Sequence, residues 1–199
     1  MCGLVGLLSK SINGMSNTQT EVFSTLLFLD QLRGDDSTGA FCVTLEGDVH
    51  LAKEASDATR FINKPEYLTL ARKAYTSGAA LIGHNRKATR GTINDENAHP
   101  FVVDDNIVLV HNGGVFGDHK KLKDTEVDSH AIAHVIHEEG DVTKAMNKID
   151  AAYALIWYDF KGETINLIRN KHRPLWWVEV SDSWLICSEK AMLDFVNSA

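Results

Sequence analysis

The sequence has no excess of positive charge, no long hydrophobic run and no leader-like N-terminus. Its 20 basic residues are outnumbered by 27 acidic ones, which gives a formal net charge of −7. A general nucleic-acid or anionic-membrane surface needs the opposite sign, so neither partner is expected. No segment approaches the roughly 18 apolar residues of a membrane span, and the N-terminus lacks the basic and apolar regions of a signal peptide. These absences predict a cytoplasmic protein.

Cysteine and proline are also scarce. The three cysteines, Cys2, Cys42 and Cys187, are an odd number without CxxC spacing, which favours free thiols in a reducing compartment. With only three prolines and no Ser- or Gly-rich linker, the 199 residues predict one compact domain over residues 1–199. No glycine-rich phosphate loop of the P-loop or Rossmann type is present, so no bound nucleotide or other cofactor is expected.

The apolar segments predict an α+β protein. Strands are expected at 2–8, 79–84, 106–112, 152–159, 164–170, 175–180 and 183–188, with a hairpin around 46–48 and tight turns linking the last four. Helices are expected from the capping-box pair Ser16 and Gln19 to Gly34, within 56–75, at 127–137 and 142–149, and from 189 onward. Hairpin-linked strands and grouped helices predict two antiparallel sheets packed face to face, with the helices outside.

Two further groups of side chains are interpreted as structural. The four tryptophans lie in strand-like segments and are expected to pack in the core: Trp157, Trp176, Trp177 and Trp184. Three histidines, His130, His134 and His137, fall on one face of a helix and offer nitrogen ligands. No HExxH pattern or cysteine partner accompanies them, so a packed or solvated helix face is favoured over a metal site.

A cysteine directly follows the initiator methionine in the opening MCGLVG. Once Met1 is removed, the α-amino group of Cys2 can serve as the general base for its own thiol. The reference pKa of an α-amine is about 7.7–8.0, so part of it is neutral near pH 7. A chance cysteine in a first strand is the alternative, and Met-Cys alone does not decide between them.

Five more motifs follow this opening in order: RGDDSTG at 33–39, GHNRKATRG at 83–91, NAHPF at 97–101, VHNGG at 110–114 and VDSH at 127–130. Together the six motifs resemble the class II glutamine amidotransferases of the N-terminal nucleophile hydrolase superfamily. These include the glutaminase domains of glucosamine-6-phosphate synthase and glutamine phosphoribosylpyrophosphate amidotransferase. The resemblance extends from residue 2 to about residue 190 and implies a four-layer αββα sandwich of two antiparallel sheets flanked by helices.

The resemblance implies that Cys2 is the nucleophile and its α-amine the base. Asn112 and Gly113 match the pair that stabilises the oxyanion. Arg86 matches the arginine that binds the α-carboxylate of glutamine, and Asp128 matches the acid that binds its α-ammonium. These roles agree with the residue types, because a planar guanidinium forks onto a carboxylate and a carboxylate pairs with an ammonium.

Four other residues take supporting places in the same resemblance. Arg33 and Gly34 match the pair that lies against the nucleophile strand, Thr89 matches a pocket residue, and His99 matches the histidine of the NAHP segment. The chain departs from the family at Lys87, where an aromatic residue is common, and also at Gly117 and His130.

The implied activity is hydrolysis of the glutamine side-chain amide through a cysteine thioester. Because no acceptor domain follows in the sequence, we expect the released ammonia to serve a separate synthetase or transferase. Two alternatives stay open: a hydrolase of another small amide or γ-glutamyl compound, and a catalytically silent glutamine-binding subunit.

Overall fold

The computed structural model describes residues 2–198. Met1, whose removal the sequence predicts, lies outside this range. The strands are β1 (Gly3–Ser9), β2 (Ser37–Thr44), β3 (Val49–Glu54), β4 (Gly78–Arg86), β5 (Phe101–Val103), β6 (Ile107–Val115), β7 (Ala151–Asp159), β8 (Thr164–Arg169), β9 (Trp176–Glu179) and β10 (Ser183–Cys187). The helices are α1 (Asn17–Asp30), α2 (Ala58–Phe61), α3 (Pro65–Ser77), α4 (Asp128–Glu139), α5 (Val142–Lys148) and α6 (Lys190–Ser198), with short 3-10 turns η1 (Gln31–Arg33) and η2 (His119–Lys121).

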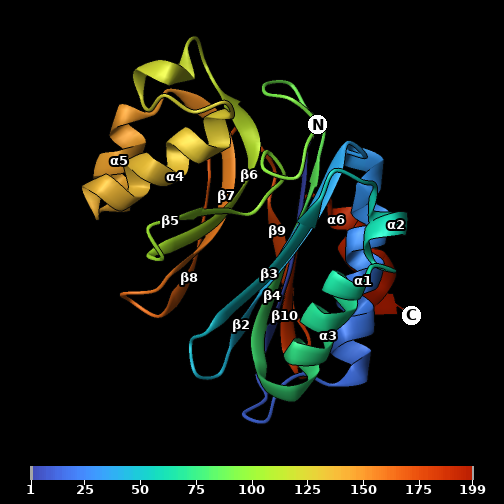
Figure 1. Ribbon diagram of the computed structural model, residues 1–199. Helices are drawn as coiled ribbons and strands as arrows, with labels where there is room; N and C mark the ends of the chain where they lie inside the picture. Colours follow the sequence, from blue (N-terminus) through green and yellow to red (C-terminus); the bar gives the residue numbers. More distant parts are fainter. Residues whose placement is uncertain (1, 199) are drawn as a thin grey trace.

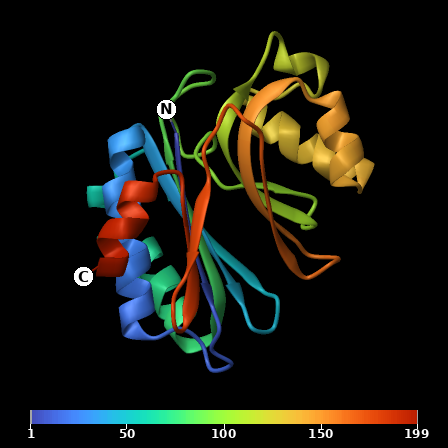
Figure 2. The same cartoon turned by 180° about the vertical axis from the view of Figure 1, so that it is seen from behind.

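The strands form two antiparallel sheets that face each other. One sheet has six strands in the order β3-β2-β4-β1-β10-β9, and the other has four in the order β5-β6-β7-β8. Helices α1, α2, α3 and α6 cover the outer face of the larger sheet, and α4 and α5 cover that of the smaller one (Figures 1 and 2). The predicted α+β class and four-layer αββα sandwich are therefore confirmed.

Each interface between layers has its own apolar core. Phe23 and Leu27 of α1 belong to the cluster between the larger sheet and its helices, and Ile132 of α4 to the cluster on the smaller sheet. Between the two sheets lies a third cluster, which includes Leu4 and Ile82. The larger sheet is covered by helices on one face and by the smaller sheet on the other, so its inner strands need apolar side chains on both faces. This explains why the sequences of β1, β2 and β4 are largely apolar without alternation.

Local signals in the sequence explain the boundaries around the nucleophile strand. The Ser16 side chain accepts a hydrogen bond from the Gln19 N–H, and the Gln19 side chain accepts one from the Ser16 N–H. This capping box starts α1 where it was predicted. The predicted hairpin is formed by β2 and β3, with Gly47 at a φ of 87° that favours glycine.

The C-terminal strands differ from prediction in two ways. The tight turn expected between β8 and β9 is instead a crossing from the smaller sheet to the larger one, because these strands belong to different sheets. Three of the four tryptophans are exposed, Trp176, Trp177 and Trp184, and only Trp157 is buried. The core assignment is thus wrong for these three: β9 is an edge strand, and Trp184 is on its neighbour β10.

The histidine face of α4 is packed and paired. His130 stacks on Phe101 with ring centroids 4.9 Å apart, and its ring lies equally far from that of His134. The His137 Nε2 atom is 3.3 Å from an Asp104 carboxylate oxygen. Within residues 2–198, no helix is long and apolar enough to cross a membrane.

Candidate active site

Cys2 directly precedes β1, an interior strand of the larger sheet. The adjoining strand β1 pairs with β4 on one side and β10 on the other, and it starts at the upper end of the sandwich in Figure 1. The Arg33 Nε–H donates to the Cys2 carbonyl oxygen at 2.9 Å, and the Leu4 N–H donates to Ser188 Oγ at 2.9 Å. Arg33 also pairs with Glu189. The backbone next to the thiol is therefore held by strand β4, by strand β10 and by the Arg33 side chain.

A small cavity of about 20 Å³ adjoins the thiol. Six of the nine predicted site residues line it: Cys2, Arg86, Thr89, His99, Gly113 and Asp128. Cys2 directly precedes β1, and Arg86 is the last residue of β4. Thr89 and His99 lie in the segment between β4 and β5, Gly113 is near the end of β6, and Asp128 begins α4. Motifs far apart in the sequence thus converge on one place. The cavity holds about one water molecule, so entry of a larger amide requires part of its wall to move.

The other three predicted residues lie behind the cavity. Arg33 holds the Cys2 carbonyl as described. Gly34 packs on the backbone after β4, where an added Cβ would lie 2.5 Å from the Arg86 carbonyl carbon. The Asn112 side-chain amide is buried and donates to Ser188 Oγ at 3.5 Å. Since Ser188 also accepts the Leu4 N–H, it links Asn112 to the nucleophile strand.

The two charged residues assigned to substrate recognition are buried. Arg86 donates through Nη1 to the Thr92 carbonyl at 3.1 Å and through Nη2 to the Arg90 carbonyl, which shapes the segment after β4. Asp128 is the first residue of α4, where the helix dipole favours a negative charge. Its Oδ2 atom accepts the Val115 N–H at 2.9 Å.

Sequence reasoning missed several residues that line the cavity, including Arg90, His111 and Ser129. His111 Nδ1 lies 2.9 Å from Ser129 Oγ, which ties β6 to α4. Arg90 lies within the GHNRKATRG motif, and its positive charge was the one feature of the sequence that could have marked it as a site residue. Its contacts with residues 115–119 depend on tertiary structure, so spacing alone does not reveal them.

The surroundings of the Cys2 thiol do not themselves favour a thiolate. Burial raises the pKa of this thiol, while the positive charge of Arg86 acts in the opposite direction. The Sγ atom approaches the Lys87 carbonyl oxygen at 3.6 Å. A thiol in this setting needs a base, which agrees with a role for the α-amine of a mature Cys2.

Two buried histidines of the cavity wall, His99 and His111, and the neighbouring His84 have a pKa that is lowered by burial. The pKa of His84 falls to about 3. Its ring stacks on that of His99 at 3.7 Å, and its Nε2 lies 2.9 Å from the His111 carbonyl oxygen. All three are therefore neutral in the folded protein at pH 7.

This cluster predicts a loss of stability on mild acidification. A histidine whose folded pKa lies below its unfolded value of about 6.5 stabilises the fold above that pH, and this contribution is lost as the pH falls. For His84, whose folded pKa is about 3, the contribution lost between pH 7 and 5.5 is about 1.2 kcal/mol. His99 and His111 change stability in the same direction. Buried Asp30, whose pKa is raised to about 7, offsets roughly 1.6 kcal/mol because its protonated form is the favoured one. Urea unfolding should show a net loss that is smaller than the loss from the histidines alone.

Asp30→Asn provides the matched control for that measurement. It removes the opposing group, so the same pH change should then lower the free energy of unfolding by about 1.6 kcal/mol more than in the parent. An unfolding free energy that is equal at pH 7 and 5.5 in both proteins would contradict the assignment of neutral buried histidines.

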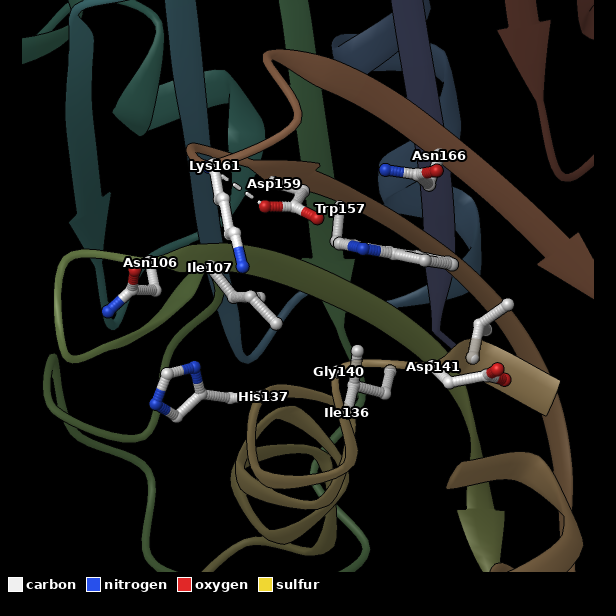
Figure 3. Close-up of a pocket in the computed structure, with 11 residues that line it drawn as sticks. Asn106, Ile107, Ile136, His137, Gly140, Asp141, Trp157, Asp159, Lys161 and Asn166 are labelled. Carbon is white, nitrogen blue, oxygen red and sulfur yellow. Dashed lines mark hydrogen bonds between the residues drawn. The ribbon is translucent and has the colours of Figure 1, made fainter. Parts of the chain in front are cut away.

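A larger cavity, of about 490 Å³, lies on the outer side of the smaller sheet. Figure 3 shows the Trp157 ring, His137 and Lys161 around it, with the Lys161 N–H donating to Asp159. It contains none of the predicted site residues and no cysteine. The residues of the motifs therefore gather at the smaller cavity beside Cys2 and not at this larger one.

The geometry and the family comparisons agree. The family model described as "Glutamine amidotransferases class-II" matches residues 1–133, and a second, "Glutamine amidotransferase domain", matches residues 84–194. The chain belongs to the class-II glutamine amidotransferases. The predicted family and enzyme class are thereby confirmed.

Among curated relatives of this amidotransferase domain, glutamine-fructose-6-phosphate aminotransferase (isomerizing) of Lactococcus lactis subsp. lactis is 32% identical over 191 residues. That alignment covers 86% of this chain and 29% of the relative. The Thermococcus kodakarensis protein of the same name is 28% identical, with coverage of 99% and 34%. The chain thus spans about a third or less of these relatives.

A solved structure gives the same fold. Glutamine phosphoribosylpyrophosphate amidotransferase from B. subtilis, complexed with ADP and GMP, superposes with a TM-score of 0.76. The match covers 98% of this chain and 44% of that one at 22% identity. At this identity the likeness speaks for the fold alone.

Proposed function

We propose that this amidotransferase domain hydrolyses the side-chain amide of glutamine and delivers ammonia to a separate acceptor enzyme. The observation that carries the proposal is the convergence of Cys2, Arg86, Gly113 and Asp128 on one cavity. Arg86 would bind the α-carboxylate of glutamine and Asp128 its α-ammonium, with Thr89 and His99 as further walls. Glutamine held in this way would direct its side-chain amide toward the thiol.

The reaction follows from these positions. The α-amine of Cys2 takes the thiol proton, and Sγ attacks the amide carbon. The Asn112 amide and the Gly113 N–H are the donors proposed for the oxyanion. Collapse of the intermediate breaks the C–N bond, and the α-ammonium returns its proton to the leaving ammonia. Water then cleaves the γ-glutamyl thioester and yields glutamate and the free thiol.

Transfer of the ammonia to an acceptor is supported by the relatives, which are named as aminotransferases. The aminotransferases named above contain a stretch equivalent to this chain plus a much longer remainder. We propose that residues 1–199 act as one domain and that the acceptor chemistry is carried by another polypeptide, with the cytoplasm as the shared compartment. No cofactor takes part in this scheme.

Ammonia release from glutamine by the purified protein tests the proposal. We expect slow release by the protein alone and faster release with a candidate synthetase or transferase, because the cavity of about 20 Å³ beside Cys2 has to widen before glutamine enters. Full activity that no partner changes would favour a simple hydrolase. Glutamine binding without turnover would identify a silent binding subunit and contradict the proposal.

A further inference from the structure

The carboxyl group of Asp30 lies directly behind the nucleophile strand. Asp30 is the last residue of α1, on the outer side of the larger sheet, and it is fully buried. A Cβ added to Gly3 would lie 1.9 Å from Asp30 Oδ2 and 2.3 Å from Oδ1, so the carboxyl group rests on the Gly3 Cα atom. Side chains alternate between the two faces of a strand, which places the Cys2 thiol on the opposite face of β1. Asp30 thus contacts the residue next to the nucleophile from outside the substrate cavity.

The fold does little to stabilise a negative charge on Asp30. Asn85 Nδ2 donates to Oδ2 at 3.1 Å, whereas Oδ1 has no hydrogen-bond partner within residues 2–198. The residue also lies at the C-terminus of a helix, where the helix dipole opposes an anion. Burial raises the pKa of Asp30 to about 7, against the Asn85 hydrogen bond and the charge of Arg33, and Glu189 acts in the same direction as burial. The neighbouring Cys187 thiol stays protonated, because burial raises its pKa to about 12.

This carboxyl group is close to the α-amine of a mature Cys2. With a Cα–Cβ bond of about 1.5 Å, Oδ2 lies at most about 3.4 Å from Gly3 Cα, and the Cys2 α-nitrogen lies at most about 5 Å from the same atom along the chain. The two groups are therefore no more than about 8 Å apart. The other charges near residue 2 are Arg33, which holds its carbonyl oxygen, and Arg86 and Asp128 on the cavity side. A carboxylate at this distance favours the protonated form of an amine.

From this contact we propose that Asp30 controls the protonation of the catalytic base: as a carboxylate, it keeps the α-amine of mature Cys2 in the ammonium form that cannot accept the thiol proton. The inference rests on the proposed function, in which that amine is the base. Asp30 touches neither the substrate nor the thiol, so it is a positioning residue that acts through the amine. The two groups titrate as a pair, and amide hydrolysis should begin at a higher pH than the amine alone would give.

The first test measures the amine itself in the Cys2→Ser background, which removes the thiol that would compete for the reagent. The pH dependence of acetylation by acetic anhydride at residue 2, located by peptide mass spectrometry, gives the midpoint of the amine titration in protein that lacks Met1. Adding Asp30→Asn should lower this midpoint by about 0.4 to 1.5 pH units, the effect of one charge about 8 Å away at effective dielectric constants of about 80 and 20. Asp124→Asn removes the same charge from a side chain that is 87% exposed, and it should leave the midpoint unchanged.

The second test follows kcat/KM for glutamine against pH in the parent and in Asp30→Asn. The acid limb of the profile should move to lower pH by the same amount as the amine midpoint. A residue that only packs would change the rate equally at every pH and leave the limb in place. Asp30→Ser, which is smaller and also uncharged, should give the same shift, so that the result does not depend on how one replacement packs or folds.

The outcomes distinguish this inference from the function on which it rests. Equal amine midpoints with and without Asp30 would overturn the inference, whatever the rate of glutamine hydrolysis. A lower midpoint with an unmoved acid limb would overturn the role of Asp30 in the reaction. A lower midpoint in a protein whose parent releases no ammonia would support the link between Asp30 and the amine and contradict the proposed hydrolysis.

Discussion

Replacement of Cys2 by serine is expected to lower the turnover of glutamine by on the order of a thousandfold or more, as removal of a covalent nucleophile does in other hydrolases. An alcohol is far harder to deprotonate than a thiol, and the surroundings of residue 2 supply little help, because burial already disfavours the thiolate. The measurement is ammonia release by purified parent and Cys2→Ser, with intact mass spectrometry to establish loss of Met1 from the active parent.

The other two cysteines serve as internal controls for this experiment. Cys42 and Cys187 are buried, and burial raises the pKa of each thiol to about 12. Alkylation that abolishes activity should therefore modify Cys2 and spare both of them. Comparable rates in Cys2→Ser and the parent, or an active protein that retains Met1, would rule out the terminal-amine mechanism.

Replacement of Arg86 by alanine should reduce kcat/KM for carboxylate-bearing amides by about 30-fold to several thousandfold, which corresponds to the 2–5 kcal/mol for truncating one partner of a buried charge pair. The contact should mainly raise KM if it is equal in the ground and transition states, and it should lower kcat if it also positions the amide. Arg86→Lys should recover only part of the loss, because a point charge does not reproduce the bidentate fork.

Propionamide, which has no carboxylate, separates recognition from folding in this series. Arg86 also holds the carbonyls of Arg90 and Thr92, so its loss affects the segment after β4 for every substrate. If Arg86 reads the carboxylate, the ratio of glutamine to propionamide hydrolysis falls in Arg86→Ala and is unchanged in Arg72→Ala, an exposed control on α3. An unchanged ratio in both variants would show that Arg86 does not recognise the substrate.

Much of the fold was predictable because its determinants are local. The Ser16 and Gln19 capping box, the Gly47 turn and the apolar runs of β1, β4 and β6 are encoded in adjacent residues. The three-residue strand β5 was not predicted, because Phe101–Val103 is too short for a periodic signal and depends on its pairing with β6.

The exposed tryptophans show what spacing leaves undecided. Trp176 and Trp177 lie in a strand, as predicted, but a strand's place at the edge of a sheet is set by tertiary pairing. The same holds for the crossing between β8 and β9. The linker at 170–175 mixes polar and apolar residues, and this composition does not distinguish a turn within one sheet from a connection to the other sheet.

For the site, ordered motifs located the residues but not their partners. Nine positions were predicted, and all of them lie at the cavity or directly behind it. Ser188, which bridges Asn112 and Leu4, lies far from every motif and gave no signal. Arg90 was within a motif, yet its ion pair with Asp128 became apparent only from the three-dimensional arrangement.

The pairing of β1 with β10 has a consequence for the order in which the enzyme is made. Leu4 and Ser188, which hydrogen-bond to each other, are 184 positions apart in the chain. At synthesis rates of about 5–20 residues per second, the start of the protein waits roughly ten to forty seconds for this neighbour. Glu189, which holds Arg33, emerges later still. The nascent chain therefore carries its thiol without the contacts that position it, and the capacity for catalysis arises only after Ser188 and Glu189 have been synthesised.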